Sequence, residues 1–101
     1  MAITSKSISV ESGGYTRIAE ASRAIIQIKN GVSIRLQVST VEPLEGNTNG
    51  IVLDENLRQL VLEDMEAGDI IYATAFGSST YTADIGLIVW DEVVVAGPGD
   101  T

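Results

Sequence analysis

Three pairs of acidic residues are the side chains in this sequence best suited to chemistry. Each pair directly follows an apolar triplet: Asp54-Glu55 after IVL, Glu63-Asp64 after LVL, and Asp91-Glu92 after IVW. Carboxylates gathered in one loop bind Ca²⁺, and two facing carboxylates hydrolyse glycosidic bonds. No loop here has the spacing of a calcium-binding EF-hand. We therefore expect each pair to mark a solvated strand end, with no metal and no cofactor.

The residue types that most often carry catalysis are missing. The chain has no histidine and no cysteine, which removes the usual general base, transition-metal ligand and thiolate nucleophile. Ser78 in Gly77-Ser78-Ser79 does not sit in a Gly-x-Ser-x-Gly turn and has no histidine to activate it. We expect no enzymatic activity.

Three aromatic residues offer a different kind of site. Trp90, Tyr72 and Tyr81 are of the type that stacks on sugar rings, which would suit a carbohydrate- or receptor-binding module. Trp90 lies inside the most apolar run, residues 85–95, so packing in the core is the favoured role. That run does not alternate with polar residues, which predicts a strand covered on both faces.

The elements that would position these residues read as β-strands. Residues 22–39 (SRAIIQIKNGVSIRLQVS) alternate around Asn30-Gly31, the dipeptide best suited to a type I′ turn, and predict a hairpin. Residues 69–76 and 81–90 predict a second hairpin. Residues 7–10 and 15–19 predict two short strands, and residues 41–50 predict the longest loop.

One stretch remains ambiguous between strand and helix. Apolar residues within 51–68 fit either two short strands or helical spacing, and we favour strands because both flanks are sheet-like. A short helical turn near residues 55–58 satisfies both interpretations.

Together the pattern predicts an all-β fold, an antiparallel β-sandwich or jelly-roll-like barrel of about seven or eight short strands. The chain of 101 residues, 45% hydrophobic but only 5% aromatic, is sufficient for one aliphatic core. We expect residues 1–20 to form an N-terminal arm or short edge strands, residues 21–96 the sandwich core, and residues 97–101 a flexible tail.

Charge excludes some partners and is unevenly distributed. The net charge of −8 argues against binding to nucleic acid or to an anionic membrane, and the polar N-terminus lacks the apolar stretch of a signal peptide. Residues 1–41 carry a net +3 and residues 42–101 a net −11. Either the two halves interleave within the fold, or the basic segment contacts the acidic part of a neighbouring subunit.

The order of the motifs adds a resemblance. The segments AIIQIKNGVSIRLQVST, VEPLEGNTNG, GIVLDE, GDIIYATAFGSST and IGLIVWDE follow one another through residues 22–92. This arrangement resembles the small β-sandwich virion structural proteins of tailed bacteriophages, of the capsid decoration and head or tail attachment types. The resemblance implies a non-enzymatic, oligomeric subunit of the virion surface, made in the host cytoplasm, with no cofactor.

These expectations combine in a protein that works by assembly. We expect a capsid decoration or cement protein, with a phage tail or head-fibre attachment protein as the nearest variant and a carbohydrate-binding module as the alternative. We expect its partners to be copies of itself, as a trimer, and a capsid or tail protein. The expected contact residues are Arg17, Arg23, Ile88, Trp90 and Val94.

Overall fold

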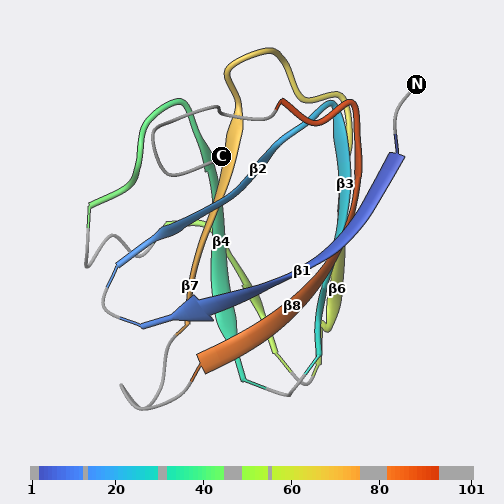
Figure 1. The fold of residues 1–101 in the computed structure, drawn as a ribbon. Helices are drawn as coiled ribbons and strands as arrows, with labels where there is room; N and C mark the ends of the chain where they lie inside the picture. The colour runs from blue at the N-terminus through green and yellow to red at the C-terminus, as the bar shows by residue number, and fades with distance from the viewer. Residues whose placement is uncertain are drawn as a thin grey trace, which may run out of the picture.

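The computed structural model describes residues 3–12, 14–29, 32–44, 49–54, 56–75 and 82–93. Within these ranges the chain forms eight strands and no helix: β1 (Ile3–Glu11), β2 (Thr16–Glu20), β3 (Arg23–Ile28), β4 (Ile34–Ser39), β5 (Ile51–Leu53), β6 (Gln59–Leu62), β7 (Ile70–Ala75) and β8 (Thr82–Trp90). They form two antiparallel four-stranded sheets packed as two layers (Figure 1). The predicted all-β antiparallel sandwich is confirmed.

The strand order gives the topology of a rolled-up hairpin. Sheet A runs β1-β8-β3-β6 and sheet B runs β2-β7-β4-β5. The first strand therefore pairs with the last, the second with the seventh, the third with the sixth and the fourth with the fifth, which is the arrangement of a jelly roll. Among the described strands only β4 and β5 are neighbours both in sequence and in a sheet, and they are joined by the longest predicted loop, residues 41–50.

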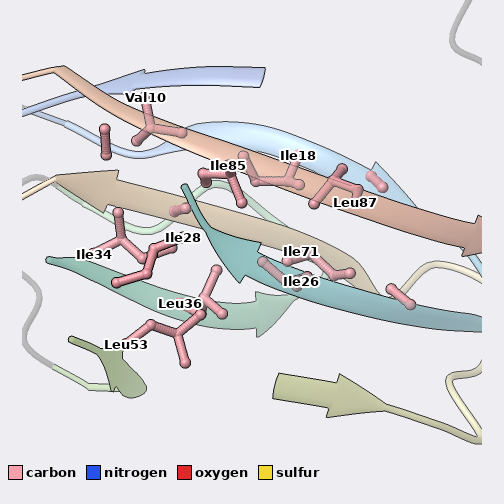
Figure 2. Packing of buried hydrophobic residues seen from close by; sticks show 14 of the residues in the cluster. Val10, Ile18, Ile26, Ile28, Ile34, Leu36, Leu53, Ile71, Ile85 and Leu87 are labelled. Carbon is pink, nitrogen blue, oxygen red and sulfur yellow. The ribbon is translucent and has the colours of Figure 1, made fainter. Parts of the chain in front are cut away.

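Both predicted hairpins are wrong. The strands flanking Asn30-Gly31, β3 and β4, lie in different sheets, as do β7 and β8. A strand whose residues alternate between apolar and polar can bury its apolar face next to the preceding strand in the same sheet or in the sheet that packs against it. Here the inward side chains of the two sheets meet across the core (Figure 2). Residues 30–31 and 76–81, where the two turns were predicted, lie outside the described residues.

Residues 51–68 form the two short strands that we favoured, β5 and β6. Between them the Asp54 carboxylate accepts hydrogen bonds from the backbone N–H groups of Asn56 (2.8 Å) and Leu57 (3.2 Å). The short polar side chain thus closes a turn after the strand, as Asp often does. Glu55, in the middle of the expected helical turn, lies outside the described residues.

The core is aliphatic, as the composition predicts. Its largest fully buried side chains come from both sheets: Ile18, Ile26, Ile28, Ile34, Leu53, Ile71, Ile85, Val10 and Val89. In β2 the pairing with β7 shifts register between Arg17 and Ala19, and the extra residue of this bulge lets Ile18 and Ala19 both be buried.

The first two strands lie at sheet edges, β1 in sheet A and β2 in sheet B. β1 pairs with β8 along its whole length, from Ile3 opposite Trp90 to Glu11 opposite Thr82. At an inward-facing position of β1, opposite Leu87, stands Lys6, whose ammonium forms an ion pair with Glu92. A lysine directed inward on an edge strand discourages the addition of another strand there. Residues 97–101, the expected tail, lie outside the described residues.

Candidate protein-contact surface

Strand β8 is buried on one face only. Its residues Ala83, Ile85, Leu87 and Val89 are at most 3% exposed, whereas the residues between them face outward. The prediction that residues 85–95 are covered on both faces is therefore wrong for the described part of the run. The outward residues include Gly86, Ile88 and Trp90, which belong to the outer face of sheet A.

The outer face of sheet A carries the outward side chains of its four strands, and three successive rows of it include Trp90, Ile88 and Gly86 of β8. Strand pairing aligns them: Ile3, Ser5, Ser7, Trp90, Ile88, Gly86, Arg23, Ile25, Gln27, Val61 and Gln59. The middle row is apolar on three strands, because Ile88 lies opposite Ile25 and Ile25 lies opposite Val61. Ile88 is 38% exposed and Val61 43% exposed, and Ile3 in the adjoining row is 57% exposed. Contiguous apolar surface of this kind marks contact sites in soluble proteins.

At one end of this face an arginine covers the tryptophan. Arg23 pairs with Trp90, and its Cζ lies 4.6 Å from the centre of the indole ring. Its Nε lies 3.2 Å from Oε1 of Glu63, which forms an ion pair with it. A cation above an indole contributes about 0.5–1 kcal/mol at an exposed site. Trp90 therefore presents a surface that is part aromatic and part guanidinium.

Next to the arginine and the tryptophan lies an open hollow of about 590 Å³. It is lined by Arg23, Trp90, Glu63, Ser22, Asp64 and Met65. The lining is mixed in charge, so the hollow does not select a ligand by charge alone.

A second hollow, of about 360 Å³, lies where β8 carries a glycine. Ile88, Ile25, Gln27 and Ser5 are among its lining residues, and Gly86 lies between them. The Lys29 side chain crosses over the glycine, since a Cβ there would lie 3.3 Å from Cδ of the lysine, and its Nζ donates a hydrogen bond to Ser7 Oγ (3.2 Å). The exposed isoleucine and the hollow are thus neighbours on one strand.

The structure brings three of the five expected contact residues together. Arg23, Ile88 and Trp90 share the outer face of sheet A. Arg17 lies on β2 in the other sheet, where Nη2 donates a hydrogen bond to the backbone oxygen of Val93 (3.3 Å) and lies 3.9 Å from Glu20. Val94 lies outside the described residues.

The three aromatic residues do not form one platform in the described structure. Tyr72 belongs to β7 of sheet B and is only 6% exposed, and Trp90 is on sheet A. Tyr72 stands between the core residues Ile71 and Ala73, so it faces the outside of sheet B. Tyr81 lies outside the described residues.

The described members of the acidic pairs follow strand ends, as expected, and several of them have partners. Glu63 and Glu92 form ion pairs with Arg23 and Lys6, and Asp91 accepts a hydrogen bond from Ser22 Oγ (3.2 Å). Among the described residues no group of three or more acidic residues could hold a metal ion. These ion pairs also join the basic first part of the chain to its acidic second part, so the two halves interleave in the fold.

Sequence reasoning missed the rest of the surface. Ile3, Ile25, Val61 and Gly86 join the expected residues only through the register of four strands that are distant in the sequence. Alternation in each strand showed which side chains share a face, but it did not show which strands are neighbours.

Two further findings concern the chain as a whole. No helix in the described part of the chain has the length and hydrophobicity needed to cross a membrane. The chain matches no protein-family model, no curated protein and no solved structure.

Proposed function

We propose that the chain is a non-enzymatic structural protein of a tailed-phage virion that decorates or cements the capsid. The observation that carries this proposal is the uncovered apolar row on the outer face of sheet A. Its exposed members, Ile88 and Val61, lie on strands β8 and β6 and not in a loop. An exposed apolar row of this kind is suited to docking against another folded protein.

The fold and the resemblance support the same proposal. Jelly rolls with eight strands are used by viral capsid domains, although a fold by itself does not determine a function. The motif order through residues 22–92 resembles phage decoration and attachment proteins. In this role the chain is made in the host cytoplasm and acts on the capsid surface, or on the tail in the attachment variant, together with copies of itself.

Binding to capsids tests the proposal. Capsids of the phage whose genome carries this sequence, stripped of the native copy, are sedimented with added purified chain. We expect saturable binding that Ile88→Asp weakens by at least about tenfold, whereas Val41→Asp, at a 68% exposed position after β4, leaves it unchanged. Absence of binding to capsids and to tails would overturn the proposal.

A carbohydrate-binding module is the second candidate, and the half-exposed Trp90 beside the 590 Å³ hollow favours it. The guanidinium of Arg23 already covers the indole, on which a sugar would stack. A glycan array distinguishes the two functions. Binding of a defined glycan that Trp90→Ala abolishes, with the melting temperature maintained, would favour this candidate over the capsid role.

A further inference from the structure

We infer that two copies of this chain join through the free edge of β6, so that their four-stranded A sheets form one continuous sheet. The two β6 strands run antiparallel around a two-fold axis that passes through Val61. This inference deepens the proposed function, on which it rests, because it names how copies of the chain join. Three observations carry it: the state of the sheet edges, the free backbone groups of β6, and the order of the residues along this strand.

The first observation is that three of the four sheet edges are protected against another strand. β1 carries the inward-facing Lys6, whose ammonium pairs with Glu92. β2 contains the bulge, and its Glu20 carbonyl oxygen already accepts a hydrogen bond from the backbone N–H of Val93 (2.8 Å). β5 has only three residues. β6 has neither a bulge nor a charged residue among its four described residues, so its edge can accept another strand.

The second observation is which backbone groups of β6 are free. The backbone N–H of Ile28 donates a hydrogen bond to the carbonyl oxygen of Arg58 (3.0 Å). Hydrogen-bonded residues alternate along an antiparallel ladder, so the even-numbered residues of β6 direct their backbone groups towards β3. The odd-numbered residues, Gln59 and Val61, direct theirs towards the free edge. An axis through Val61 therefore lets this residue exchange both backbone hydrogen bonds with its counterpart in the second copy.

The third observation is the order of the residues around Val61. The sequence from Arg58 to Asp64, RQLVLED, is complementary to its own reverse. Pairing around Val61 places Leu60 opposite Leu62 of the other copy, and both leucines pack against the core while only partly buried in one copy. Arg58, before the strand, comes into line with Asp64, after the strand, of the other copy. Opposite charges therefore meet twice, which specifies the register of an isologous contact.

The paired sheets also extend the surface on which the proposed function depends. In one copy Ile88 lies opposite Ile25, and Ile25 lies opposite Val61. The axis stands perpendicular to the joined sheet, so the outer faces of both copies lie on the same side. The same three residues of the second copy continue the row in reverse order. The dimer thus presents one apolar row that crosses both copies.

Cysteine cross-linking tests this register directly, because the chain has no cysteine of its own. Val61→Cys places two thiols opposite each other across the axis at a Cα separation of about 5.5 Å, within the range of about 4.4–6.8 Å that disulfides span. Gln59→Cys, on the same strand and the same face, is the matched control. In this register Gln59 lies opposite Glu63, so the two control thiols are at least about 13 Å apart. We expect mild oxidation to convert most of the Val61→Cys chain to a covalent dimer, and little of the control.

Charge at position 59 tests the same contact without a covalent bond. Gln59→Lys brings opposite charges together with Glu63 of the other copy at both ends of the contact, and Gln59→Glu brings like charges together there. By sedimentation velocity of the full chain we expect Gln59→Lys to dimerise at least about threefold more tightly than the parent and Gln59→Glu at least about tenfold more weakly. The same two substitutions at Thr40, an exposed position after β4, change the net charge equally and should change the affinity far less.

The outcomes separate this inference from the proposed function. A parent chain that is monomeric at high micromolar concentration, a trimer such as the sequence led us to expect, or equal cross-linking at positions 59 and 61 would each overturn the contact through β6. Equal effects of charge at positions 59 and 40 would overturn it too. Capsid binding is measured separately by sedimentation with capsids. A monomer that binds capsids contradicts only the inference, and a dimer through β6 that binds neither capsids nor tails contradicts only the proposed function.

Discussion

Two isoleucines of β8, three residues apart, should respond to truncation in opposite ways. Ile85 is fully buried and packs in the core between the sheets, whereas Ile88 is 38% exposed on the outer face of sheet A (Figure 2 shows Ile85 among the core residues). The sequence of the run predicted the same environment for both. Truncating each residue to alanine therefore measures how β8 is buried.

The expected magnitudes differ several-fold. Ile85→Ala removes buried methyl groups and leaves a cavity, at a cost of about 2–5 kcal/mol. A domain of this size has a total stability of roughly 5–15 kcal/mol, and its melting temperature falls by about 4–8 °C for each kcal/mol. We expect Ile85→Ala to melt at least about 8 °C below the parent. Ile88→Ala should change the melting temperature by only about 2–4 °C, the scale of a surface substitution.

Thermal melting followed by circular dichroism is the assay, at low micromolar concentration so that self-association contributes little. Urea unfolding of the same variants gives the free energies directly. Equal losses of stability for the two variants would refute the one-sided burial of β8. A larger loss for Ile88→Ala would refute it too, and with it the assignment of the outer face as a contact surface.

Three further predictions test local features of the fold. Gly50→Ala should lower the free energy of unfolding by about 1–3 kcal/mol, because φ at this residue is +113° and the added Cβ overlaps a β4 carbonyl oxygen. Gly86→Ala, the control, should leave the free energy of unfolding nearly unchanged. Urea unfolding compares the two variants, and equal losses would contradict this prediction. Tyr15→Phe should cost about 1 kcal/mol in the same assay, since its hydroxyl accepts a 2.8 Å hydrogen bond from Gln37, and an unchanged value would show that this bond contributes nothing. Asp64 has a left-handed backbone, with φ of 56°. Asp64→Gly should therefore raise the free energy of unfolding by roughly 0.5–1 kcal/mol, and Asp64→Val should lower it. The reverse order would contradict the left-handed backbone at this position.

The class of the fold was predictable from the sequence, but its connections were not. Alternation within residues 34–38 and 23–28 depends on each strand alone, so the strands and their buried faces could be predicted. Which strands are neighbours depends on how the whole chain rolls up, and the Asn30-Gly31 signal, which is local, favoured a hairpin between β3 and β4 that does not form.

The contact surface could be predicted only in part, for the same reason. Trp90 and Ile88 could be predicted as contact residues because they belong to the apolar run of residues 85–95. Ile25 comes from β3, which the rolled topology places beside β8, so that Ile25 lies opposite Ile88, more than 60 residues away in sequence. Val61 comes from β6, which lies beside β3 with Val61 opposite Ile25. The residues that alternate with these on the same strands face inward and are also apolar. Composition alone therefore could not separate the residues of the core from those of the outer face.

The accessibility of one introduced cysteine tests the central claim, that the outer face of sheet A is the assembly surface. The chain has no cysteine, so Val61→Cys, on this face, and Val41→Cys, away from it, each introduce a single thiol at a position that is exposed in the free chain. The rate of maleimide labelling is measured for the dilute chain and for the chain bound to capsids. We predict that assembly slows labelling at position 61 by at least about tenfold and leaves position 41 unchanged, because a thiol in a buried interface is inaccessible to the reagent. Equal labelling at position 61 in both states, or protection at position 41 alone, would contradict the claim.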